Sequence, residues 1–226
     1  MKTYHKINTI WKRDQQGKLL EGQWSRPEFE YLKDNAWVFT EKVDGTNIRV
    51  MWDGIGQITF GGKTDNAQMP AGLVAALNNL FLGGLGLKYF SENWKDVPCC
   101  LYGEGYGAKI QKIGGNYKAD GQDFVLFDVR VGHLWLDRDS VADIATQLGL
   151  RVVPVYTTGT LQRMVDLVRD DVLLSHWGPF KAEGLIGRPV HELLDRRGER
   201  IITKLKAVDF HGTLEAVESA SAANTR

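Results

Sequence analysis

Lys42 is the residue whose type and setting point most directly to chemistry. It lies in the segment 41–47, which reads EKVDGTN, between two strand-like stretches and just before a glycine turn. A deprotonated lysine is an amine nucleophile, and nearby cations and desolvation can lower its pKa. Attack of such an amine on the α-phosphate of ATP would form a lysyl phosphoramidate and release pyrophosphate. On its own, however, a lysine in a hairpin is usually a solvated surface residue.

A site of this kind needs further parts, and the sequence supplies them in order. It needs carboxylates for Mg²⁺, cations for phosphates and a flat ring for a purine base. The candidates are Glu104 in YGEGYG, Phe127 in FVLFDV, Glu183 in AEGLI, and the two lysines of KLK, Lys204 and Lys206. The two lysines share a face of a strand because strand side chains repeat every two residues. Two amines in one pocket repel each other unless an anion lies between them.

Each candidate also has a structural interpretation. Glu104 could be a turn residue, Phe127 a core ring, and Asp128 the cap of a strand end. Lys204 and Lys206 could form a solvated strand face. The candidates gain weight only together and in this order.

The elements that must position these residues are mostly strands. Strand patterns are predicted at 37–42, 46–52, 58–60, 99–104, 124–131, 152–155, 185–186 and 201–206. Helices are predicted at 70–82, where the pair Gly83 and Gly84 ends the pattern, and at 140–148 and 160–168. The first 35 residues mix polar and aromatic side chains without a clear period. The pattern predicts an α+β domain of antiparallel strands with flanking helices.

Bulk composition excludes several classes of protein. The chain has 226 residues, of which 43% are hydrophobic and 25% are charged, which argues against disorder. No apolar run is long enough to span a bilayer, and the N-terminus has no apolar core of signal-peptide type. Cys99 and Cys100 are adjacent, so they cannot build a disulfide framework or a zinc site. With 28 basic and 28 acidic residues, any contact with nucleic acid must come from a local basic face.

The ordered set of motifs resembles the covalent nucleotidyltransferase superfamily, which includes DNA ligases, RNA ligases and mRNA capping enzymes. The matching segments KVDG, YGE, FD, EGLI and KLK resemble motifs I, III, IIIa, IV and V, and they span about three quarters of the chain. Within the superfamily, the segment 41–47 is most similar to the branch of phage RNA ligase 2. The resemblance implies an ATP-grasp-like ligase adenylation domain, with ATP and Mg²⁺ or Mn²⁺ as cofactors.

The resemblance also implies roles for individual residues. Lys42 is the nucleophile. Lys204 and Lys206 contact the α-phosphate and help to activate Lys42. Glu183 binds a metal ion or its waters, and Asn47 orders the nucleotide or a water on the metal. The residues implied to contact the nucleotide are Glu41, Asn47, Lys63, Glu104, Phe127 and Glu183, with Phe127 stacked on adenine.

This sequence departs from the branch at two positions. The branch usually has an arginine after motif I, where this chain offers Lys63, which cannot make a bidentate contact with phosphate. Asp44 is typical of DNA ligases rather than of the RNA ligase 2 branch. About twenty residues follow Lys206, too few for an OB-fold domain or for the helical domain of RNA ligase 2 relatives. Nucleic acid would then be held by one domain, with Lys12, Arg13 and Lys18 either contacting phosphates or lying in a solvated loop.

The sequence thus predicts an ATP-dependent RNA ligase that joins 3′-hydroxyl and 5′-phosphate ends. Its predicted domain covers residues 1–210, followed by a flexible tail at 211–226. RNA is the favoured nucleic acid, while the form of the substrate is left open among nicked duplex, RNA/DNA hybrid, single strand and a tRNA break. The protein is expected to be a monomer that contacts no membrane. The resemblance places such a ligase in RNA repair, in the cytoplasm of a phage-infected bacterium. A DNA ligase, a capping guanylyltransferase and a catalytically silent protein that binds nucleic-acid ends are the alternatives.

Overall fold

The computed structural model describes residues 3–170 and 173–211, and it divides into two compact units. Unit 1 comprises Met1–His5 and Asp44–Val153, and unit 2 comprises Lys6–Val43 and Pro154–Arg226. Most of unit 1 is therefore one continuous segment of chain, inserted between the two halves of unit 2. The predicted tail lies, apart from residue 211, outside the described residues.

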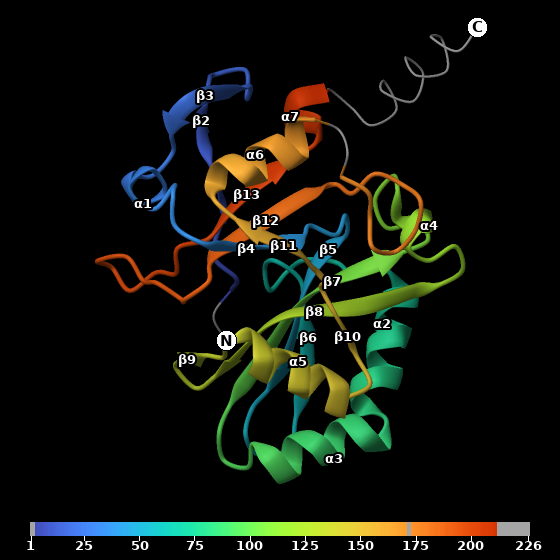
Figure 1. The fold of residues 1–226 in the computed structure, drawn as a ribbon. Helices are drawn as coiled ribbons and strands as arrows, with labels where there is room; N and C mark the ends of the chain where they lie inside the picture. The colour runs from blue at the N-terminus through green and yellow to red at the C-terminus, as the bar shows by residue number, and fades with distance from the viewer. Residues whose placement is uncertain (1–2, 171–172, 212–226) are drawn as a thin grey trace, which may run out of the picture. The chain divides into compact units, whose positions relative to one another are not determined.

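Unit 1 is built on a six-stranded sheet with the order β10-β8-β7-β5-β6 and with β9 paired to β8 (Figure 1). All of its strand pairs are antiparallel except β10 with β8. Its strands are β5 (Thr46–Trp52), β6 (Ile58–Gly61), β7 (Cys99–Gly107), β8 (Gln122–Val131), β9 (Leu134–Trp135) and β10 (Arg151–Val152). Its helices are α2 (Ala71–Leu77), the π-helix η1 (Asn78–Leu82), α3 (Gly84–Asn93), α4 (Gly114–Tyr117) and α5 (Arg138–Gln147).

One face of this sheet carries the core of unit 1. Ile48, Val50 and Trp52 alternate along β5 and pack with Leu73 and Phe90 from the helices. This alternation follows from the two-residue period of a strand. It leaves the odd-numbered side chains of β5 on the opposite face of the sheet.

Unit 2 contains a five-stranded sheet with the order β1-β13-β12-β4-β11 and a two-stranded sheet of β2 and β3. Only β1 and β13 pair in parallel. Its strands are β1 (Asn8–Thr9), β2 (Trp11–Arg13), β3 (Leu19–Trp24), β4 (Trp37–Glu41), β11 (Val155–Gly159), β12 (Gly184–Pro189) and β13 (Thr203–Lys206). Its helices are α1 (Pro27–Tyr31), α6 (Leu161–Arg169) and α7 (Val208–His211).

The core of unit 2 lies under α6, which contacts β11, β12 and β13 (Figure 1). Leu161, Met164 and Val168 of this helix are fully buried and pack with Phe39 and Leu205 from the sheet. The helix begins where Thr160 Oγ1 accepts a hydrogen bond from the N–H of Arg163. A threonine is a favoured cap at this position. The helix predicted at 160–168 is confirmed by α6.

Three predicted elements differ in detail from the structure. The helix predicted at 70–82 is present as α2 and η1, but the chain becomes helical again at Gly84, where the glycine pair predicted an end. The helix predicted at 140–148 begins two residues earlier, because Asp137 is its cap and accepts a hydrogen bond from the N–H of Ser140. The strand predicted at 152–155 is two strands, β10 and β11, separated at Pro154, which has no N–H to donate to a sheet.

The predicted fold class is confirmed, since antiparallel strands dominate both large sheets and helices flank them. Among the described residues, no single helix is long and apolar enough to cross a membrane. One bent pair, Ala71–Leu82 with Gly84–Asn93, meets the length and composition criteria jointly.

Candidate functional site

Lys42 directly follows β4 and stays bonded to the neighbouring strand. Its backbone N–H donates to the carbonyl oxygen of Gly184 at 2.9 Å, which fixes Lys42 beside the start of β12. Gly184 allows a close approach of β12 to β13, because a Cβ there would lie 2.0 Å from the carbonyl oxygen of Leu205. The glycine of the EGLI segment therefore has a packing reason as well as a possible functional one.

Glu183 links two of the predicted catalytic lysines. Its carboxylate oxygens lie 2.5 Å from Lys42 Nζ and 2.6 Å from Lys206 Nζ. Glu183 is 8% exposed, so its carboxylate is largely shielded from water, whereas the two lysine side chains are partly exposed. The carboxylate is thus the anion that the two amines need between them, and the cluster keeps a net positive charge that suits a phosphate group.

Lys204 lies on the same face of β13 as Lys206, as the sequence predicts. Along this strand Thr203 and Leu205 are buried, whereas the two lysines that alternate with them are half-buried. Lys204 pairs with Ile186 of β12. The interpretation of this strand as an entirely solvated face does not hold for Lys206, whose ammonium is bound to Glu183.

Glu41 precedes Lys42, and its carboxylate is 1% exposed. It accepts hydrogen bonds from Ser175 Oγ at 2.6 Å and from the N–H of His176 at 2.8 Å. Burial raises the pKa of Glu41, and these two hydrogen bonds oppose that rise. In this structure Glu41 fastens the loop at 175–176 to the strand that carries Lys42.

In unit 1, Asn47 and Glu104 lie directly opposite each other on β5 and β7. Each alternates with core positions, so both project from the face of the sheet that is opposite the core. Gly45 lies against this pair, since a Cβ there would be 2.7 Å from Glu104 Cγ and 2.3 Å from the oxygen of Gly105. Glu104 lies within β7 rather than in a turn.

Phe127 also lies on this outer face, at a β-bulge. Tyr102 pairs with Asp128 but Gly103 pairs with Leu126, which leaves Phe127 as the extra residue of β8. Phe127 is half-buried and is not among the residues of the unit 1 core. Asp128 lies in mid-strand and is fully buried, so it does not cap a strand end.

Lys63 lies in an exposed loop after β6, and Arg49 holds this loop in place. Arg49 is 0% exposed, with Nε 2.8 Å from the oxygen of Gly62 and a terminal guanidinium nitrogen 2.7 Å from Asp65 Oδ1. This guanidinium lowers the pKa of Asp65. Sequence reasoning passes over Arg49, although its two-residue spacing from Asn47 places both on one strand face.

Each unit, taken by itself, has one shielded side-chain oxygen of the kind that a hydrated divalent cation binds. Among the described residues, Asn47 Oδ1 is buried without a hydrogen-bond partner, and Glu183 offers a shielded carboxylate. In the same described part, no group of three or more His, Cys, Asp or Glu side chains is placed to hold a metal. Mg²⁺ commonly uses one or two carboxylates with waters and substrate phosphates, so Glu183 suits this mode of binding.

The basic residues of the N-terminal segment have different surroundings. Arg13 is bound by both carboxylate oxygens of Asp209, at 2.8 and 2.9 Å, and donates to the oxygen of Gly17. Lys12 and Lys18 are exposed. Their predicted contacts with nucleic-acid phosphates remain predictions.

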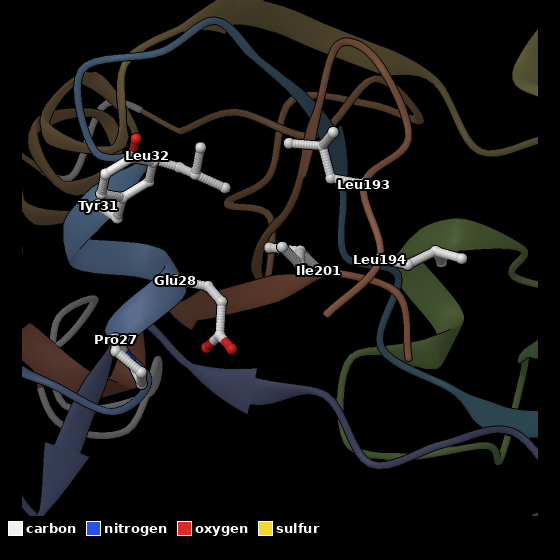
Figure 2. Close-up of a pocket in the computed structure, with 7 residues that line it drawn as sticks. All are labelled: Pro27, Glu28, Tyr31, Leu32, Leu193, Leu194 and Ile201. Atoms are coloured by element: carbon white, nitrogen blue, oxygen red, sulfur yellow. The ribbon is translucent and has the colours of Figure 1, made fainter. Parts of the chain in front are cut away.

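Unit 2 also has an apolar pocket of about 390 Å³ between α1 and the segment after β12 (Figure 2). Figure 2 shows the Glu28 side chain and the side chains of Leu32 and Ile201 around it. The lining residues are Pro27, Glu28, Tyr31, Leu32, Leu193, Leu194 and Ile201. None of the predicted site residues lines this pocket.

Comparison with known protein families gives a specific result for this chain. The sequence profile of the RNA ligase family matches residues 35–206, most of the chain. The chain therefore belongs to the RNA ligase family. A search of curated protein sequences finds no significant match.

Solved structures of an RNA ligase from Naegleria gruberi are similar in fold. The structure with pyrophosphate has a TM-score of 0.60 and 20% sequence identity, and the match covers 100% of this chain and 65% of that one. A lysine-to-alanine mutant with ATP and Mn has a TM-score of 0.62 and 21% identity, covering 85% of this chain and 54% of that one. A mutant without ligand has a TM-score of 0.60 and 22% identity, covering 80% and 52%. The chain thus spans 52% to 65% of the length of these structures.

Proposed function

We propose that this chain is an ATP-dependent RNA ligase that joins a 3′-hydroxyl to a 5′-phosphate through a lysyl-AMP intermediate on Lys42. The observation that carries the proposal is the cluster of Lys42, Glu183 and Lys206. Membership of the RNA ligase family supports it. So does the likeness in fold to a ligase whose structures contain ATP and Mn, or AMP and Mn.

In the first step, Lys42 Nζ attacks the α-phosphorus of ATP. The bond to the pyrophosphate oxygen breaks as the N–P bond forms, and the amine proton passes to solvent. In the structure Nζ donates to Glu183 and is held in an ion pair with its carboxylate. The ion pair must therefore open before attack, and Lys206 and Lys204 then offer their charges to the α-phosphate.

A divalent cation fits the same scheme. Held through Glu183, Mg²⁺ or Mn²⁺ would supply positive charge that stabilises the transferring phosphoryl group. The side chain of Glu183 would then exchange an ammonium partner for the metal ion. In the structure its ion pairs with Lys42 and Lys206 hold the carboxylate in place.

Unit 1 is proposed to recognise the nucleoside part of ATP. Glu104 holds the ribose or supports the site, and the half-buried ring of Phe127 stacks on adenine. Lys63 serves the phosphate end, on a loop held by Arg49. Glu41 acts through its hydrogen bonds to the loop beside Lys42, because both carboxylate oxygens already accept protein donors.

The remaining steps transfer and then release AMP. A 5′-phosphate oxygen attacks the phosphorus of lysyl-AMP, the N–P bond breaks, and Lys42 regains its proton. A 3′-hydroxyl then attacks the 5′-phosphate, which forms the phosphodiester bond and releases AMP.

Incubation with ATP labelled at the α-phosphate tests the first step. The wild-type protein is expected to carry label in the presence of Mg²⁺, and Lys42→Ala is expected to carry none. Lys88→Ala is the matched control, because Lys88 is exposed on α3, and it should label like the wild type. Label on Lys42→Ala would contradict the proposal.

Sealing assays across RNA and DNA ends test the substrate. The proposal expects nicks with RNA at the 3′-hydroxyl side to be sealed. If only all-DNA nicks are sealed, the chain is a DNA ligase, the alternative that Asp44 favours. Binding of nicked duplex without any label would identify a silent end-binding protein, and labelling by GTP alone would identify a guanylyltransferase.

A further inference from the structure

The β-bulge in β8 places two consecutive side chains on the outer face of the unit 1 sheet. Phe124 and Leu126 belong to the core before the bulge, and Val129 belongs to it afterwards. The extra residue therefore shifts the alternation by one position. Without it, Asp128 rather than Val129 would point into the core, so the bulge turns Asp128 to the side of Phe127.

Tyr4 contacts both of these side chains. Its hydroxyl donates to Asp128 Oδ2 at 2.5 Å, and its ring meets the Phe127 ring edge-on with centroids 5.1 Å apart. Asp128 is 0% exposed. A buried polar group is costly without a hydrogen-bond partner, so the bond between the Tyr4 hydroxyl and Asp128 fixes the outer end of the Tyr4 ring.

Aromatic neighbours hold the rest of the Tyr4 ring. It stacks on His5 with centroids 4.7 Å apart, and it meets Tyr102 at 5.2 Å and Trp135 at 5.8 Å. Tyr102 and Trp135 are themselves 5.2 Å apart. With contacts on several sides and a hydrogen bond at its tip, Tyr4 has little freedom to change rotamer.

Phe127, in contrast, is half-buried on the surface of a sheet and would be free to turn without a neighbouring ring. A stacking residue binds a base more tightly when its ring is already in the bound orientation. We propose that Tyr4 is a positioning residue that fixes the Phe127 ring for stacking on the purine base of ATP, with Asp128 anchoring Tyr4. This inference rests on the proposed function and adds a residue far from the motifs.

The test compares Tyr4→Ala and Tyr4→Phe with the wild type in lysyl-AMP formation. Loss of the ring should raise the KM for ATP about tenfold, the size of one lost aromatic pair, and leave kcat within about twofold. Tyr4→Phe keeps the ring but loses the hydrogen bond to Asp128, so it should have a KM between those of Tyr4→Ala and the wild type. Tyr31→Ala makes the same chemical change at a residue that is 86% exposed in unit 2, and it should behave like the wild type.

Inorganic tripolyphosphate, used as a competitive inhibitor, separates positioning from general damage. It has no base, so Tyr4→Ala should leave its inhibition constant unchanged while the KM for ATP rises. An equal rise in both constants, or an unchanged KM, would overturn the inference. If Tyr4→Ala does not fold, Tyr4→Leu replaces it, because leucine keeps apolar volume without a ring. The KM for ATP should again rise while the inhibition constant of tripolyphosphate stays unchanged.

These experiments also distinguish failure of the proposed function from failure of the inference about Tyr4. A wild-type protein that takes no label from ATP overturns the proposed function and this inference with it. A labelled wild type, together with a Tyr4→Ala variant that has the wild-type KM, overturns the inference alone.

Discussion

Glu41 and Lys42 are neighbours in sequence, yet their side chains serve different ends. Lys42 reaches Glu183, whereas the Glu41 carboxylate is buried and bound by Ser175 and His176. Strand geometry turns consecutive side chains to opposite sides, which explains how adjacent charged residues can have separate partners. The segment EKVDGTN therefore contains both the candidate nucleophile Lys42 and Glu41, which holds the neighbouring loop at 175–176 in place.

Glu41→Ala is therefore expected to destabilise the fold rather than only to affect chemistry. The change leaves the Ser175 hydroxyl and the N–H of His176 without their acceptor, which should cost about 1 to 3 kcal/mol in the free energy of unfolding at neutral pH. Urea denaturation measures this loss. Glu41→Gln keeps one acceptor oxygen and should lose less, and equal losses for both variants would contradict the assignment.

The raised pKa of Glu41 gives a separate prediction for pH. Burial lifts the folded-state pKa above the ordinary value of 4.5, so the folded protein holds this proton more tightly than the unfolded chain does. The resulting stabilisation is fully present below pH 4.5 and is lost as the pH rises through the folded-state pKa. The stability of the wild type relative to Glu41→Gln should fall as the pH rises from about 4 towards 7, and a constant difference would exclude the shift.

At the scale of elements, close approaches between strands and turns decide where the candidate residues lie. Gly45→Ala would place a Cβ 2.3 Å from the oxygen of Gly105 and 2.7 Å from Glu104 Cγ. One of them must shift, so we expect a loss of about 1 to 3 kcal/mol in stability and slower formation of lysyl-AMP. Thermal unfolding and the labelling assay measure the two effects.

Gly115→Ala is the matched control for this change. Gly115 lies in α4, and a Cβ there would meet nothing within 4 Å. The same methyl group should therefore be neutral or should stabilise the protein by about 0.4 to 1 kcal/mol. Equal destabilisation by both substitutions would show that the contact of Gly45 with β7 is not the cause.

The main strands and the order of the candidate residues follow from the sequence, because alternation and motif spacing are local properties. Lys204 and Lys206 share a face as their two-residue spacing predicts. The β-bulge at Phe127 could not be predicted, since the pattern FVLFDV reads as unbroken alternation and the shift depends on pairing with β7. Tyr4 could not be predicted either, because Tyr102, Phe127 and Asp128, which it contacts, lie more than ninety positions further along the chain.

At the scale of the whole molecule, the described residues form two separate hydrophobic cores. One packs residues of unit 1 around β5, β7 and β8, and the other packs residues of unit 2 around α6. The division also separates the candidate residues, with Lys42, Glu183 and Lys206 in unit 2 and Asn47, Glu104 and Phe127 in unit 1. The sequence predicts one domain over residues 1–210, and the independence of the two units is open to direct measurement.

Paired core substitutions test whether each unit is a cooperative unit of its own. Leu77 in unit 1 and Leu161 in unit 2 are both 0% exposed, so Leu77→Ala and Leu161→Ala make the same cavity-forming change in different cores. Each should cost about 2 to 5 kcal/mol locally. Because proteins open in contiguous cooperative parts, hydrogen exchange should accelerate mainly at 44–153 for Leu77→Ala, and mainly at 6–43 and 154–211 for Leu161→Ala. Uniform acceleration across both units by either variant would mean that the chain unfolds as one.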